Sequence, residues 1–167
     1  ATEPHAVDHV EARLVHLARY MGVRDLRVED PGAAQKLQVE LIGNSISRPG
    51  DVVGLRVTNL QRPGSDARIL NITVLCLSSD WSIAQIHPAG AGNFQPLSPG
   101  ETINLEFDAL LPAGQTLSVD TLKVFATRAT TNFRWLELPA LDQPLTRPAT
   151  RSMNMNALEQ LLAAVTD

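Results

Sequence analysis

The sequence has little cysteine, few aromatic residues, no long apolar run and no excess of basic charge. A single cysteine, Cys76, cannot form an internal disulfide, so the fold does not depend on oxidising conditions and a cytoplasmic location is expected. The net charge of -4 disfavours nucleic acid as a partner, because binding to phosphate backbones depends on neutralising cations. No run approaches the roughly 18 apolar residues of a membrane span. We therefore expect a soluble protein that has neither a nucleic-acid nor a membrane partner.

The amino-acid composition is that of an ordinary globular domain. The 167 residues are 44% hydrophobic and 19% charged, which is enough apolar material for one domain with a substantial core. The N-terminus lacks the basic and apolar regions of a signal peptide. Its first residue is Ala1 rather than methionine, as expected of a module excised from a larger protein.

Residues 1–36 are expected to form an amphipathic helix and a tether. Apolar residues recur at steps of three and four, which is the spacing of one helical face, at Val7, Val10, Leu14, Leu17 and Met21. Thr2 with Pro4 is a suitable helix start, and Gly22 is a usual helix stop. The segment from Val23 to Lys36 has no period and contains a turn signal.

Residues 37–141 are expected to form an antiparallel, immunoglobulin-like β-sandwich. Short β-rich runs alternate with turn signals, at 37–42, 52–59, 69–77, 81–87, 102–109 and 122–127. The first, second and fifth runs each have one apolar face, as half-buried strands do. The run from Ile69 to Leu77 is apolar on both faces in its second half, which predicts a central strand. No helical crossover long enough for parallel strands is present.

Residues 142–167 are expected to form a linker and a C-terminal amphipathic helix. Ser152 is a suitable N-cap, and one helical face follows it at Met155, Leu158, Leu161, Leu162 and Val165. The predicted fold is thus mainly β, a sandwich flanked by two amphipathic helices. Both helices should pack on the sandwich or on a neighbouring molecule.

Two histidines with helical spacing are the only candidate for metal binding. His5 and His9 are four residues apart with Asp8 between them, but no third ligand can be identified and the pair lies at a chain terminus. His16 is interpreted as a surface residue. We expect no metal and no cofactor.

Cys76 and His87 are the candidate nucleophile and base. A catalytic thiolate requires partial exposure and electropositive surroundings, whereas Cys76 lies in an apolar strand. The serines lack a nucleophile elbow, and Gly90-Ala91-Gly92 is interpreted as a flexible loop. The expectation is a chain without catalytic residues.

The few aromatic residues suggest one interaction patch. Trp81, Phe133, Arg134 and Trp135 are candidate binding residues, because tryptophan and arginine are favoured anchors at protein interfaces. The competing interpretation is that Phe133 and Trp135 cap the core of the sandwich.

Three segments within residues 69–141 carry a resemblance to a known family. They are Trp81 to Pro88 (WSIAQIHP), Leu122 to Thr127 (LKVFAT) and Phe133 to Pro139 (FRWLELP). Together with Leu17 to Tyr20, Leu26 and Asp30-Pro31, they resemble the β-rich region C-terminal to the protease domain in caspase-like proteins (metacaspase-type, peptidase C14). The resemblance implies that a His/Cys protease domain lies outside this chain.

The leading hypothesis is a non-catalytic accessory or regulatory domain that binds a caspase-like protease domain, in the same polypeptide or in another protein. A small-molecule or carbohydrate-binding sandwich, with Trp81 or Trp135 as a stacking platform, is the first alternative. An unrecognised hydrolase is the second.

Overall fold

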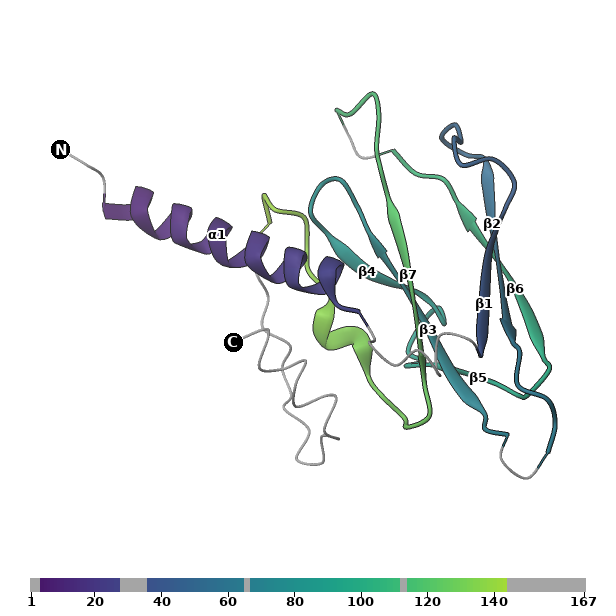
Figure 1. The fold of residues 1–167 in the computed structure, drawn as a ribbon. Coiled ribbons are helices and arrows are strands. Elements are labelled where there is room, and N and C mark those ends of the chain that lie inside the picture. Colours follow the sequence, from purple (N-terminus) through teal and green to yellow (C-terminus); the bar gives the residue numbers. More distant parts are fainter. Residues whose placement is uncertain (1–3, 28–35, 65–66, 112–113, 144–167) are drawn as a thin grey trace.

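A computed structural model describes residues 4–27, 36–64, 67–111 and 114–143. One α-helix, α1 (Pro4–Asp25), precedes the strands, and a 3-10 turn, η1 (Phe133–Leu136), follows them. The strands are β1 (Leu37–Ile42), β2 (Val52–Asn59), β3 (Leu70–Leu77), β4 (Ile83–His87), β5 (Gln95–Leu97), β6 (Thr102–Asp108) and β7 (Thr121–Thr127) (Figure 1). The predicted C-terminal helix lies outside the described residues.

The strands form two antiparallel sheets, which confirms the mainly β prediction. The first sheet has the order β1-β2-β6. In the second, β3 pairs with β7 along its whole length, and β4 and β5 share its other edge. Each of the six predicted strands matches an observed one to within two residues at either end. Strand β5 was not predicted, because its three residues around Pro96 are too few to show an alternating pattern.

The two sheets pack face to face around a common core. Leu55, Val57 and Leu105 of the first sheet belong to the same buried cluster as Ile72 and Val74 of the second. Alternate residues of a strand point to opposite faces, so the apolar faces of β2 and β6 point inward as predicted.

Strand β1 is more exposed than the half-buried strand that was predicted. Its inward residues Val39 and Leu41 are 44% and 48% exposed, although they lie in register with Val57 and Leu55 of β2. The reason is geometric, since β1 is the edge of the first sheet and the described part of the second sheet ends at β7. Among the described residues, the second sheet therefore leaves Val39 and Leu41 partly uncovered.

The outer face of the second sheet carries a third layer. Leu75 and Leu77 of β3 are fully buried there, against the C-terminal half of α1 and against η1. Both faces of β3 are thus covered, as predicted for a central strand. The helix crosses this face obliquely, and its N-terminal half extends beyond the sheets (Figure 1).

Helix α1 is attached through a face that its apolar periodicity did not indicate. His16, Tyr20 and Val23 are buried, and they recur at helical spacing. His16 Nε2 lies 2.9 Å from the carbonyl oxygen of Trp81, and the Tyr20 hydroxyl donates to the Ser78 carbonyl at 3.2 Å. The prediction of a surface position for His16 was wrong, because this ring hydrogen-bonds the β3–β4 turn.

The end of α1 is fixed by a strand residue. Lys123 of β7 donates from Nζ to the carbonyl oxygens of Val23 and, at 2.7 Å, of Arg24. These are among the carbonyls that a helix C-terminus leaves without intrahelical partners, and a cation is favoured there. This contact, and the burial of Val23, explain why the helix continues past Gly22 to Asp25.

Replacement of Leu75 by alanine tests the double burial of β3. The side chain is fully buried beneath α1, so its loss should lower the free energy of unfolding by about 2–5 kcal/mol. Urea unfolding measures the change. Ile46, which is 86% exposed, supplies the control: I46A should change stability by less than about 0.5 kcal/mol. Equal effects of the two substitutions on stability would contradict the burial of Leu75 beneath α1.

Candidate functional site

A cleft of about 710 Å³ opens between the two sheets. The sheets spread apart at the end that carries the β1–β2, β3–β4 and β6–β7 connections (Figure 1). Leu41, Val53 and Phe107 form its wall on the side of the first sheet, and Ile86 and Leu122 form the opposite wall. The interior is thus apolar and open to solvent.

The opposite end of the sandwich is held closed by a buried asparagine. Asn59, at the end of β2, is fully buried, and its side-chain amide donates to the carbonyl of Leu97 in β5 at 3.1 Å and to that of Arg68 at 3.3 Å. Its side-chain oxygen accepts from Gln61. These bonds connect the two sheets, because β2 and β5 belong to different ones.

At the open end, the hydrogen bonds described here connect residues on the same side of the cleft. On the side of the first sheet, the carbonyl oxygen of Ala109 accepts from the backbone N–H of Gly50 at 2.9 Å. The N–H of Ala109 donates to the carbonyl oxygen of Asp51 at 2.8 Å. On the other side, the Ser79 hydroxyl lies 2.8 Å from Gln115 Oε1 and 2.9 Å from Ser118 Oγ. The two walls are therefore each stabilised internally.

The rim of the cleft is acidic. Asp80, Asp108 and Asp120 line it, together with hydroxyl and amide side chains. Among the described residues that line the cleft, none is lysine, arginine or histidine. An apolar interior below three carboxylates favours a bound group that is apolar with cationic ends.

Cys76 lies in the cleft but is not activated. Burial raises the pKa of its thiol, and the nearby carboxylates of Asp120 and Asp80 raise it further, against a lowering hydrogen bond from Ser78. The Cys76 sulfur lies 3.6 Å from Ser78 Oγ. These surroundings favour the thiol over the nucleophilic thiolate.

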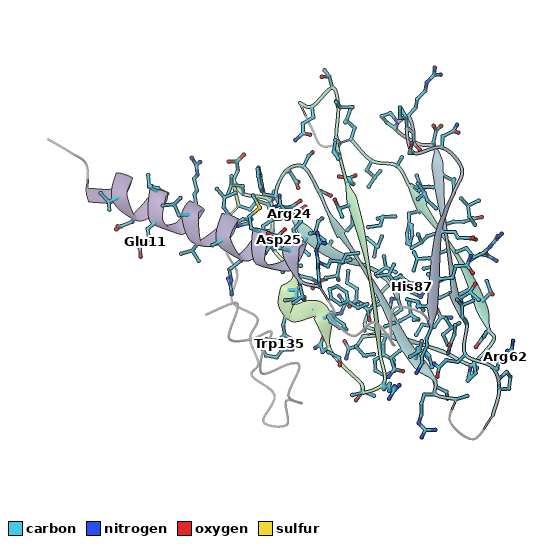
Figure 2. The ribbon with its side chains drawn as sticks, in the orientation of Figure 1. Glu11, Arg24, Asp25, Arg62, His87 and Trp135 are labelled. Carbon is cyan, nitrogen blue, oxygen red and sulfur yellow. The ribbon has the colours of Figure 1, made fainter. Side chains whose placement is uncertain are left out.

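In the structure, His87 does not lie opposite Cys76 in the β3–β4 pair. The β3–β4 register places Ala84 opposite Cys76 and His87 opposite Val74 (Figure 2 labels His87). Burial lowers the pKa of His87, and a hydrogen bond with the Gln95 side chain opposes this shift. Both members of the candidate pair are therefore favoured in their neutral forms.

Of the candidate metal residues on α1, the structure describes the side chains of Asp8 and His9 but not that of His5. His9 is exposed. Within the described ranges, no group of three or more His, Cys, Asp or Glu side chains is placed to hold a metal ion. The described part also contains no helix with the length and hydropathy of a membrane span.

The aromatic patch predicted from the sequence is divided between core and surface. Phe133 is only 1% exposed and stacks on Phe125, with ring centroids 4.2 Å apart. The prediction that Phe133 belongs to an exposed patch is thus corrected: its ring fills the core between η1 and β7. Trp135 is half-buried on η1 and lies away from the cleft (Figure 2).

Trp81 and Arg134 are engaged within the molecule. Trp81 has a φ of +66°, which is uncommon for a bulky residue, and its ring meets Tyr20 edge-on at 5.1 Å. Arg134 donates to the carbonyls of Gly90 and Gly92 and pairs with Glu137 at 3.2 Å. Arg134 thus holds the Gly90-Ala91-Gly92 loop, which was interpreted as flexible.

Comparison with protein-family models, curated proteins and solved structures found no match. The resemblance to caspase-like proteins accordingly remains a hypothesis that rests on sequence segments.

The reactivity of Cys76 should report the environment of the cleft. Because its thiol pKa is raised, alkylation by iodoacetamide should be slower in the folded chain than in urea, and its rate should still be increasing at pH values where an ordinary thiol is fully ionised. The rate as a function of pH, followed by mass spectrometry, measures this. A folded-state rate equal to that in urea would contradict a partly buried, unactivated thiol.

The lowered pKa of His87 predicts an acid-side loss of stability. The unfolded chain takes up a proton near the ordinary pKa of 6.5, whereas the folded chain does so only at lower pH, so protonation favours unfolding as the pH falls through 6.5. Between about pH 7.5 and 5, wild type should therefore lose more unfolding free energy than H87Q. Parallel urea titrations of both proteins provide the measurement. Identical pH dependences would exclude this role for His87.

Proposed function

We propose that this chain is a non-catalytic protein-interaction module whose inter-sheet cleft binds an extended apolar segment of a partner protein. The observation that carries the proposal is the cleft of about 710 Å³, next to an uncovered strand of the first sheet. Leu41 belongs to both features, since it lines the cleft and is one of the exposed inward residues of β1.

The pairing pattern supports an extended binding mode. Within the described residues, β7 pairs only with β3, so its other edge presents free backbone groups. A partner strand added there would lie opposite β1 and bury Val39 and Leu41. Strand addition of this kind combines backbone hydrogen bonds with pockets for alternate side chains.

We also infer an immunoglobulin-like strand order with one position vacant. In such a fold, the first, second and fifth strands form one sheet, which packs on a sheet that contains the third and sixth strands. Here the order β1-β2-β6 matches the first of these sheets, and the β3-β7 pair matches part of the second. In that order a seventh strand pairs with the sixth, beside β7. The vacancy supports the idea that a partner completes the sandwich.

The negative charge along the cleft indicates which kind of partner segment it would bind. Asp80, Asp108 and Asp120 are best matched by a segment in which lysine or arginine flanks apolar residues. Its association should weaken as salt is raised, because exposed charges are screened.

The partner that the sequence resemblance suggests is a caspase-like protease domain, in the same polypeptide or in another protein. The module would then act by docking on that domain while the protease residues reside elsewhere. The raised thiol pKa of Cys76 supports a binding role for the cleft over thiol catalysis.

A second candidate function is the binding of a small apolar ligand. The volume of the cleft falls within the range of roughly 300–1,000 Å³ typical of ligand sites. A carbohydrate platform receives less support, because the ring of Trp81 packs against Tyr20 and Trp135 lies away from the cleft.

Substitution of Leu41 by aspartate tests the cleft as the docking site. A carboxylate on its apolar wall should weaken association with a separately expressed caspase-like protease domain by about tenfold or more, because a buried charge is costly. Isothermal titration calorimetry provides the dissociation constants.

Leu60 provides a matched control for this experiment. It is 48% exposed, as Leu41 is, but it follows β2 at the closed end of the sandwich. L60D should bind like wild type. Equal weakening by L41D and L60D would place the interface elsewhere, and absence of binding by the wild-type chain would reject this partner.

A further inference from the structure

The closed end of the sandwich carries basic side chains that the proposed function does not use. Lys36 and Arg128 line a small hollow of about 70 Å³ between the start of β1 and the end of β7. Arg62 and Arg68 lie on the β2–β3 connection at the same end, where Figure 2 labels Arg62. The carboxylate of Glu101, also at this end, accepts a hydrogen bond from a backbone N–H of its own turn. We call the four basic residues the cationic end.

The cationic end is exposed and has apolar neighbours. Arg62 and Arg128 are exposed, and within the described part of the chain neither forms an ion pair. Leu60 and Ile69, which are close to Arg62 and Arg68 in the chain, are 48% and 54% exposed. The surface therefore offers a partner both positive charge and apolar area.

Hydrogen bonds hold this surface in shape. Gln61 Nε2 donates to the carbonyl oxygen of Arg68 at 3.1 Å, and the Arg68 N–H donates to Gln61 Oε1 at 3.2 Å. The buried Asn59 donates to the same carbonyl oxygen. The N–H of Leu60 donates to the carbonyl oxygen of Lys36 at 2.8 Å. Because the backbone of the surface is already ordered, little entropy is lost when a partner binds it.

The cleft at the other end has the complementary composition. Asp80, Asp108 and Asp120 line it and give it negative charge. Leu110 and Leu117 also line it, and these side chains are 75% and 76% exposed. Each end thus combines exposed apolar side chains with charge, and the charges of the two ends are opposite in sign. Such complementarity favours contact between the two surfaces.

The two surfaces cannot meet within one molecule. The β2–β3 connection and the connections that frame the cleft lie at opposite ends of the sandwich (Figure 1). Strand β3, with eight residues, runs between these ends and spans about 26 Å. A contact between the cationic end and the cleft must therefore join two copies of the chain.

We propose that the cationic end of one copy docks in the acidic cleft of a second copy. This head-to-tail contact occupies the cleft until a partner protein displaces it, and so regulates access to the site. The inference rests on the proposed function in one respect, namely that the cleft is a docking site. Because the two contacting surfaces differ, every copy in a pair retains an unused surface, and association continues beyond the dimer.

Charge reversal at each end tests the contact. R62E with R128E makes the cationic end acidic, and D108R with D120R makes the cleft cationic. Each variant then has two ends of the same sign, so its self-association should be weaker than that of wild type by about tenfold or more. Sedimentation velocity over a concentration series at low ionic strength measures this. The mass of wild type should rise with concentration beyond that of a dimer.

Mixing the two variants tests the head-to-tail geometry. The acidic end of R62E/R128E matches the cationic cleft of D108R/D120R, and the unchanged surfaces of the two variants also match each other. The mixture should therefore associate as wild type does, although each variant alone remains monomeric. Recovery on mixing also demonstrates that both variants are folded.

A control separates the contact from a general effect of charge. R13E with R27E changes the net charge of the chain as R62E with R128E does, but its exposed residues lie on α1 and just after it. This variant should self-associate as wild type does. Raised salt should weaken the association of wild type, because it screens exposed charges.

Two results would overturn the proposal. The first is a wild-type chain that stays monomeric up to about 1 mM, since any contact is then too weak to occupy the cleft. The second is self-association that persists unchanged in both charge-reversal variants, which would place the contact on another surface.

Binding of the protease domain distinguishes this proposal from the proposed function. R62E with R128E should leave the affinity for that domain unchanged, because its cleft is intact. If the domain binds through the cleft while wild type remains monomeric, the proposed function stands and the head-to-tail contact is rejected. If the domain does not bind while the two variants associate only when mixed, that partner is rejected and the head-to-tail contact is supported.

Discussion

Burial of both faces of β3 is the constraint on which the rest of the structure depends. Ile72 and Val74 point into the space between the sheets, while Leu75 and Leu77 point toward α1 and η1. A strand that is apolar on both faces requires a layer on each side to remove it from water. The C-terminal half of α1 therefore forms one of these two layers. The hydrogen bonds of Tyr20 and Lys123 hold it in place.

The same arrangement leaves one end of the sandwich open. Asn59 connects the sheets at one end through buried hydrogen bonds, whereas at the other end Cys76 of β3 faces a cleft. Sheet order adds to this asymmetry, since within the described residues nothing pairs with the outer edge of β7 and the inward side chain of Leu41 stays exposed. Leu41 belongs both to the wall of the cleft and to the exposed inward face of β1.

Periodicity predicted the strands well because alternation is a local property of the sequence. It was less informative about which neighbour covers each face. The stripe beginning at Val7 was the clearest helical pattern, yet the sandwich contacts a face marked by His16 and Tyr20, whose polar atoms bond to distant carbonyls. Residue type alone left Phe133 open to two interpretations, a surface patch or the core, and the structure places it in the core. The cleft could not be predicted, because its walls come from segments that only the sheet pairing brings together.

The cleft between the sheets is the proposed docking site, and the reactivity of Cys76 measures its occupancy most directly. This thiol lines the cleft and is the only one in the chain, so alkylation by a small reagent reports occupancy without any substitution. With saturating caspase-like protease domain, alkylation of Cys76 in the folded chain should slow strongly. An unchanged rate in a complex shown to be saturated would exclude the cleft as the docking site.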